Sequence, residues 1–232
     1  MEVAEIIEPM LRTGPGAAVY SPLVLRLYDA WVLGFSNRWA WSCSTRSVLL
    51  PFYRKHVGAR HLEVGVGTGY YPAHVEADGS GSGQLTLLDM NEHCLVAAAN
   101  RLGRRGIRLI AHDVMKKPAR LAGEHYDSIA LFYLLHCLPG GMAEKSRIFG
   151  NLKNNLSPDG IMFGATVLGD DAKHNLVGKI LMKKYNKKGI FNNRTDSVDN
   201  LRRALCRHFA EVHVEQQGVI ALFSARSPIH AS

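Results

Sequence analysis

The sequence has few cysteines, and their spacing excludes two kinds of small, cross-linked protein. Four occur among 232 residues. They lie at Cys43, Cys94, Cys137 and Cys206, with no C-x-x-C pair among them. A disulfide framework or a structural zinc site needs cysteines at characteristic spacings. We therefore expect free thiols, no metal ion and a cytoplasmic protein.

Long apolar runs are also missing. No stretch approaches the ~18 residues of a membrane-spanning helix. Residues 1–9 are acidic and lack the basic start and apolar core of a signal peptide. A hydrophobic content of 47% and a charged content of 21% are ordinary for a soluble globular protein. The length fits one domain with a small appendage.

The most informative stretch is residues 61–70, where an apolar strand runs into glycines at alternate positions. It spells E-x-G-x-G-x-G, with Glu63, Gly65, Gly67 and Gly69. Strand, tight turn and helix in this order are typical of a nucleotide-cofactor crevice. Glycine is needed where a Cβ would block the bend or hold the backbone away from a ligand.

The spacing of these glycines argues against two nucleotide classes. Neither the dinucleotide motif G-x-G-x-x-G nor the phosphate loop G-x-x-x-x-G-K-[ST] occurs. An acid as close to the turn as Glu63 repels a pyrophosphate and favours a cationic ligand. An NAD dehydrogenase is therefore disfavoured.

Strands and helices alternate along the rest of the chain, which predicts a parallel sheet covered on both faces. We expect strands at 61–66, 84–89, 107–111, 126–132, 160–167, 211–217 and 219–226, the last two joined by a hairpin. We expect helices at 45–56, 70–78, 92–103, 142–156 and 195–209. Asn91 is the expected cap of the third helix, and Thr195-Asp196 that of the last.

Taken in order, these segments resemble the motifs of class I S-adenosylmethionine (SAM)-dependent methyltransferases. The resemblance covers roughly residues 61–170. It rests on the glycine turn, Asp89 and Asp113 at two strand ends, the fourth strand, and residues 154–161, which are similar to an L-x-P-G-G turn. It implies an α/β fold: a doubly wound, mostly parallel seven-stranded sheet of order 3-2-1-4-5-7-6, with the last strand antiparallel. It also implies SAM as cofactor and S-adenosylhomocysteine (SAH) as product.

The resemblance further implies which residues bind the cofactor. Asp89 would accept hydrogen bonds from the ribose hydroxyls, Asp113 would lie near the adenine amino group, and Tyr20 would cover the methionyl end. The implied set is Tyr20, Glu63, Gly65, Gly67, Thr68, Gly69, Asp89, Met90, Asp113, Val114 and Phe132.

Two segments are candidates for covering the crevice. Residues 1–58 contain all three tryptophans and are expected to form an N-terminal helical lid on an α/β domain at 59–232. The alternative is that these aromatic side chains only pack against the domain. Residues 168–194 form a basic, partly amphipathic insertion. We expect it to be an acceptor-binding cap, with a dimer contact or a membrane-surface helix as alternatives.

His136 and Tyr133 are the candidate catalytic residues. They follow the fourth strand, at the carboxyl edge where open α/β sheets bind ligands. An imidazole has a pKa suited to taking a hydroxyl or amine proton, so His136 is a candidate base. The alternatives are a histidine held by backbone groups and a Tyr133 that only packs. His174, in the insertion, is a weaker candidate. Methyl transfer from a sulfonium depends mainly on alignment, so a base is not obligatory.

The absence of certain motifs narrows the range of possible methyl acceptors. The [DN]-P-P-[FY] and Pro-Cys motifs of DNA methyltransferases are missing, and Asp127 lies inside the fourth strand, which does not support the metal-dependent catechol type. We expect metal-independent methylation of a planar or apolar small molecule at O, N or C, by a monomer or homodimer.

Two other functions stay open. The net charge of +8 suggests an RNA methyltransferase or a nucleic-acid binder as one alternative. The basic residues are scattered along the chain, which disfavours binding to nucleic acid. The other is a protein of this fold that binds the cofactor without methylating.

Overall fold

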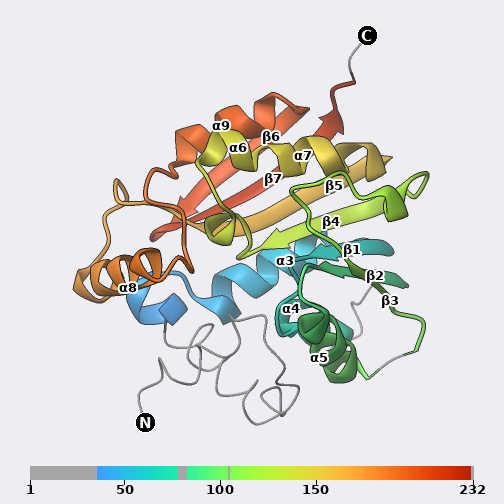
Figure 1. Cartoon of the computed structure of the whole chain (residues 1–232), viewed down its shortest axis with the longest axis horizontal. Coiled ribbons are helices and arrows are strands. Elements are labelled where there is room, and N and C mark those ends of the chain that lie inside the picture. Colours follow the sequence, from blue (N-terminus) through green and yellow to red (C-terminus); the bar gives the residue numbers. More distant parts are fainter. Residues whose placement is uncertain (1–35, 78–82, 104, 231–232) are drawn as a thin grey trace.

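A computed structural model describes residues 36–77, 83–103 and 105–230 of the chain (Figure 1). Its centre is a seven-stranded sheet of order β3-β2-β1-β4-β5-β7-β6. The strands are β1 Arg60–Val64, β2 Gln84–Asp89, β3 Arg108–Ala111, β4 Tyr126–Phe132, β5 Leu156–Val167, β6 Phe209–Gln217 and β7 Ile220–Pro228. Neighbouring strands from β3 to β5 are parallel, and β7 is antiparallel to both β5 and β6. The predicted strand order and antiparallel last strand are confirmed.

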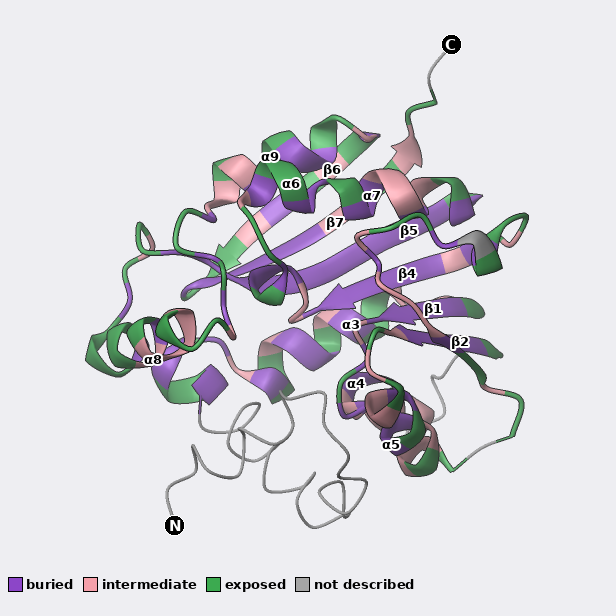
Figure 2. Ribbon diagram, in the orientation of Figure 1, coloured by how far each residue is buried: buried purple, intermediate pink, exposed green. Residues whose placement is uncertain are grey.

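Helices cover both faces of this sheet, which is why its central strands are buried almost throughout (Figure 2). One face carries α3 Leu50–His56, α4 Tyr70–Ala77 and α5 Glu92–Leu102, and the other carries α6 Met142–Lys145, α7 Arg147–Leu152 and α9 Val198–Cys206. Helix α8, Leu176–Lys187, lies beyond the carboxyl ends of the parallel strands, on the α3 side. Further short helical segments are η4 Thr45–Leu49, η5 Ala119–Leu121, η6 Leu135–Cys137 and η7 Lys153–Asn155.

The ends of the helices agree with the sequence at one site and differ at two. Asn91 caps α5, since its Oδ1 accepts from the His93 N–H at 3.0 Å. The predicted Thr195-Asp196 cap is wrong, because Ser197 caps α9. The predicted helix 142–156 is split at Ser146, whose hydroxyl donates to the Ala143 carbonyl at 2.7 Å, a local bond that interrupts helices. Strand β5 also begins four residues before the predicted start at 160.

The described part of the predicted lid contributes to the core. Trp41 is 2% exposed and Tyr53 is fully buried, with the Tyr53 ring centroid 5.1 Å from that of Phe132. Tyr20 and the helix expected to start there lie outside the described residues. The role of residues 1–58 as a lid therefore stays a prediction. In the ranges that the structure describes, no helix is long and apolar enough to cross a membrane.

Candidate active site

Three glycines form the turn between β1 and α4, and each has a left-handed backbone. Their φ angles are +70° at Gly65, +53° at Gly67 and +67° at Gly69. A Cβ at Gly65 would lie 2.8 Å from Leu134 Cδ1, and a Cβ at Gly69 would lie 2.8 Å from Ala98 Cβ. At Gly67 none of the described atoms lies within 4 Å of that position. Two glycines therefore permit close packing, whereas Gly67 borders space that a ligand can enter.

The carboxylate of Asp89 lies against this turn, at the carboxyl end of β2. Its Oδ2 accepts from the Gly67 N–H at 3.3 Å, and its Oδ1 accepts from the Asn91 N–H at 2.9 Å. Burial raises the pKa of Asp89, although the bonds from these N–H groups oppose the rise. The next residue, Met90, has a side chain that is 69% exposed at the same edge. A carboxylate in this place fits a ribose diol at Gly67.

Strand β3 brings Asp113 to the same edge of the sheet. The His112 N–H donates to the Asp89 carbonyl at 3.0 Å, so the two strand ends are joined. Asp113 Oδ1 accepts from the Met115 N–H at 3.0 Å, which closes a turn around the buried Val114. The structure thus gathers Asp89, Asp113 and Val114 at the edge that holds the glycine turn. Their contact with a cofactor stays a prediction.

Glu63 belongs to a buried hydrogen-bond network that includes α3. The Tyr53 hydroxyl donates to Glu63 Oε2 at 2.6 Å, and His61 Nε2 lies 3.0 Å from the same oxygen. His61 Nδ1 lies 2.7 Å from Ser128 Oγ on β4. Because strand side chains alternate, His61 and Glu63 share one face of β1, a signal that the sequence already contains. The network fixes the Glu63 carboxylate next to the glycine turn.

The end of β4 carries a backbone that is unusual for a residue with a side chain. Tyr133 has φ +56°, in a region where strain concentrates at ligand sites. Its hydroxyl donates to Asn37 Oδ1 at 2.8 Å, and burial raises its pKa well above the ordinary value. The preceding Phe132 is 4% exposed, and its ring centroid lies 4.6 Å from that of Tyr71. Thr68, in the glycine turn, is also buried.

His136 follows in η6 and is 2% exposed. The Val167 N–H donates to its Nδ1 at 3.3 Å, so the neutral ring carries its proton on Nε2. Burial, with a smaller contribution from the Lys145 charge, lowers the pKa of His136 to about 3. Its ring centroid lies 4.4 Å from that of Phe191. These features favour a role for His136 in positioning other groups, and they disfavour uptake of a proton by its ring.

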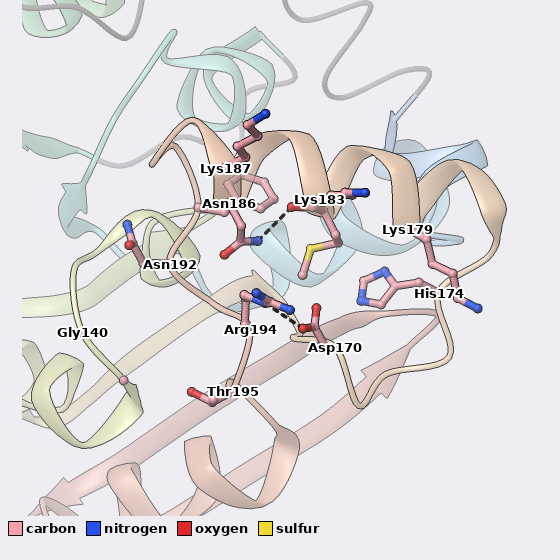
Figure 3. A pocket seen from close by; sticks show the side chains of 13 residues that line it. Gly140, Asp170, His174, Lys179, Lys183, Asn186, Lys187, Asn192, Arg194 and Thr195 are labelled. Carbon is pink, nitrogen blue, oxygen red and sulfur yellow. Dashed lines mark hydrogen bonds and ion pairs between the residues drawn. The ribbon is translucent and has the colours of Figure 1, made fainter.

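The predicted insertion lines most of an open pocket of about 860 Å³ between α8, residues 192–195 and the Gly140-Gly141 loop (Figure 3). Met182 and Phe191 are its apolar lining residues, and both are largely buried in the pocket wall. The lining also includes His174 and several charged or amide side chains. The Asn192 N–H donates to the His136 carbonyl at 2.8 Å, which ties the pocket wall to the end of β4.

A second feature near this pocket had no clear signal in the sequence. The Lys145 ammonium on α6 is fully buried, 2.6 Å from Asp196 Oδ2 and 2.7 Å from the Asn192 carbonyl. It joins α6 to the segment that closes the pocket, across 51 residues of chain. Among the described residues, no group of three or more His, Cys, Asp or Glu side chains could hold a metal ion.

A methyltransferase family model matches part of this sequence, and curated relatives align with most of it. The family model described as a methyltransferase domain matches residues 62–162. The physcion biosynthesis cluster O-methyltransferase of Aspergillus chevalieri is 41% identical over 216 residues, which cover 93% of this chain and 96% of that protein. The putative uncharacterized protein YbcY of Escherichia coli strain K12 is 46% identical over 195 residues, which cover 83% of this chain and 98% of YbcY.

The fold of this chain is also similar to that of a solved structure. The structure of the DhpI–SAH complex superposes with a TM-score of 0.63 at 14% identity, covering 91% of this chain and 94% of DhpI. That likeness concerns the fold, and the sequence relatives extend it to the enzyme family. The glycine turn with Asp89 against it fits SAM, because the Gly67 position is open and the carboxylate faces it. The chain therefore belongs to the class I SAM-dependent methyltransferase family.

Proposed function

We propose that this methyltransferase transfers the methyl group of SAM to an oxygen atom of a planar small-molecule acceptor. Bound SAM supplies a methyl group activated on a sulfonium, so the chain contributes binding, alignment and exclusion of water. The observation that carries the proposal is the contact of Asp89 with the Gly67 N–H beside open space. The name of the Aspergillus relative, an O-methyltransferase, supports oxygen as the atom methylated.

The proposed cofactor site uses the residues at the carboxyl edge of the sheet. Asp89 would bind the ribose, and Asp113 with Val114 would line the adenine region. Gly65, Gly67 and Gly69 shape the turn, with Thr68, Met90 and Phe132 as its further neighbours. Glu63, held by Tyr53 and His61, would present negative charge to the ammonium group of the cofactor. Tyr20 remains a proposed contact to the methionyl end.

The proposed acceptor site is the pocket under α8, with residues 168–194 as its cap. Phe191 forms a wall shared by the pocket and His136, because the two ring centroids are 4.4 Å apart. His136 and Tyr133 would then position the acceptor. A planar ring fits against Phe191 and Met182.

We further propose that the chain acts in the cytoplasm, as a monomer or homodimer, and without nucleic acid. The four thiols are free, which suits a reducing compartment.

The test combines binding with methyl transfer. Calorimetry with SAH should give binding by the wild type and at least a tenfold weaker affinity for Asp89→Ala, because the carboxylate that accepts the ribose hydroxyls is lost. Arg60→Gln, a change at the far end of β1, serves as the control. Incubation with methyl-labelled SAM and a panel of phenols, amines and activated carbons should label oxygen. Equal SAH affinity in Asp89→Ala and the wild type would refute the site.

A further inference from the structure

The pocket under α8 carries an excess of positive charge. Lys179, Lys183 and Lys187 recur at every fourth residue of the helix, so they lie along one side of it. Arg194 and Asp170 complete the charged lining, so four positive charges and one negative charge leave a formal +3. Arg194 Nε already pairs with Asp170 Oδ2 at 2.8 Å (Figure 3). Within the described ranges, the three lysines have no carboxylate partner.

The rest of the lining suits an acceptor with a flat apolar body. Met182 and Phe191 lie in the pocket wall and are only 3% and 8% exposed, so each adds an apolar edge that its neighbours hold in place. Asn186, Asn192 and Thr195 add neutral polar groups to the lining, although the Asn186 amide N–H groups already donate to the Met182 carbonyl at 3.0 Å and to Asn193 Oδ1 at 3.1 Å. A ligand with an apolar ring and an oxyanion matches both parts, because a field of one sign concentrates ligands of the opposite charge.

The side chains near the pocket that could remove a proton from an acceptor already form hydrogen bonds or an ion pair within the protein. His136 Nδ1 already accepts from the Val167 N–H, and the neutral ring presents only a donor at Nε2. The Tyr133 hydroxyl donates a hydrogen bond to Asn37 Oδ1 and so keeps its proton. The Asp170 carboxylate is paired with Arg194, and a carboxylate is in any case a weak base toward a phenol.

His174 is the remaining histidine of the pocket lining. Its Nε2 lies 2.8 Å from the Gly169 carbonyl and 3.2 Å from the Leu168 carbonyl, which fixes the proton on Nε2. Its Nδ1 is buried without a hydrogen-bond partner. That atom faces α8, since a Cβ on Gly178 would lie 3.2 Å from it. The lone pair of His174 is therefore directed at the helix and away from an acceptor.

We propose that the pocket selects an acceptor that is already an oxyanion at neutral pH, so that the chain supplies positive charge and no general base. The acceptor class is an acidic phenol or enol, or a carboxylate, on a planar apolar body. This inference rests on the proposed function, because it places the methyl acceptor in the pocket under α8.

The charge balance of the transfer agrees with a protein that supplies positive charge and no general base. The oxyanion lone pair forms the new O–CH3 bond while the S–CH3 bond breaks, and the electrons of that bond remain on sulfur. An anion and a sulfonium thus give a neutral ether or ester and a thioether, and no proton has to leave. A neutral hydroxyl would leave one proton for the protein to take.

The first test measures acceptor ionisation without any turnover. A chromogenic phenol with a pKa of about 7 is titrated by absorbance in the presence of the protein and SAH, since phenol and phenolate absorb at different wavelengths. We expect the bound phenol to have a lower pKa than the free one, and phenolate binding to be at least threefold weaker in Lys183→Gln. Lys184→Gln is the matched control, because Lys184 is the next residue on α8 and does not line the pocket. A bound pKa at or above the free value would overturn the proposal.

The second test uses the pH dependence of methylation. Two phenols with pKa values of about 7 and about 10, and an aromatic carboxylate, are compared as acceptors. The inflection of kcat/KM should move with the acceptor pKa by about three pH units between the phenols and should be absent for the carboxylate above pH 6. Label on the carboxylate or on the phenol tells the two oxyanion sources apart. An inflection that stays fixed for both phenols and disappears in His174→Asn or His136→Asn would overturn the proposal in favour of a protein base.

The outcomes also separate this inference from the proposed function. If SAH binds but no acceptor is methylated while phenolate is still bound with a lowered pKa, the proposed function fails and the anion site stands. If methylation proceeds with equal efficiency on neutral and ionised phenols, the function stands and the anion site fails.

Discussion

Gly67 and Gly69 lie in the same turn, but a Cβ would contact Ala98 only at Gly69. Alanine substitutions at the two positions should therefore distinguish an effect on folding from an effect on cofactor binding. Gly69→Ala should destabilise the fold by about 2 kcal/mol or more, because its Cβ would lie 2.8 Å from Ala98 Cβ in a left-handed backbone. Gly67→Ala should cost only about 1 kcal/mol, for the backbone alone. It should still weaken SAH binding at least tenfold.

Urea denaturation and calorimetry on the same two variants check this contrast. Gly103→Ala, which also has a positive φ and no described atom within 4 Å of a Cβ, is a control for the backbone cost away from the site. Undiminished SAH binding in Gly67→Ala would show that the ligand does not approach this glycine.

The buried His136 should make stability depend on pH. Its pKa is lowered to about 3 by burial, whereas the unfolded chain titrates near 6.5. Its contribution is therefore fully present above pH 6.5 and is lost as the pH falls toward 3. At pH 5 the loss amounts to about 2 kcal/mol relative to pH 7.5.

His136→Gln offers the matched comparison, because an amide oxygen can accept from the Val167 N–H without titrating. The free energy of unfolding of the wild type minus that of the variant should fall by about 2 kcal/mol between pH 7.5 and 5 in urea titrations. Other histidines whose pKa burial lowers, such as the half-buried His56 and His208, cancel in this difference. A difference that does not change with pH would contradict the burial of a neutral ring.

At the scale of elements, features that depend on neighbouring residues were predicted correctly. Features that depend on contacts between distant parts of the chain were not. The glycine turn, the Asn91 cap and the alternation of strands and helices all lie within short windows, so they could be read directly. The cap of α9 was placed wrongly at Thr195-Asp196, because the Asp196 carboxylate pairs with Lys145 on α6, 51 residues away, and Ser197 accepts from the Asn200 N–H instead. Tyr53 was missed for the same reason, since its partner Glu63 lies in another element.

The Lys145–Asp196 pair should be a strong link between α6 and the segment that closes the pocket. Both side chains are fully buried and 2.6 Å apart. Lys145→Met should destabilise the protein by about 3 to 5 kcal/mol, because it leaves a buried carboxylate without its cation. Lys145→Met with Asp196→Leu should recover part of that loss, since the uncompensated charge is removed as well.

Chemical denaturation of the single and double variants measures the effect. The exposed pair of Arg202 and Asp199 on α9 provides the control, and Arg202→Gln should change stability by less than about 1 kcal/mol. A double variant less stable than Lys145→Met alone would mean that Asp196 contributes mainly through bonds other than the ion pair.

For the whole molecule, the strand order followed from the resemblance, whereas the position of the pocket did not. The order of motifs along the chain was enough to predict a sheet whose strand order reverses between the parallel neighbours β1 and β4, where ligands of such sheets bind. The net charge of +8 is a property of the whole chain and gives no location. Only the fold shows that three of the lysines lie along one pocket while others lie elsewhere.

Cofactor binding should stabilise the whole fold, because the glycine turn and the ends of β2 and β3 form only in the native state. At 100 times its dissociation constant, a ligand that binds only the native state contributes about 2.7 kcal/mol. For a chain of this size, that raises Tm by about 5 to 10 °C in a thermal unfolding experiment with SAH. NAD at the same concentration should leave Tm unchanged, since Glu63 beside the turn repels a pyrophosphate. Asp89→Ala should lose the SAH shift while keeping a cooperative transition, and an equal shift with NAD would instead indicate a dinucleotide site.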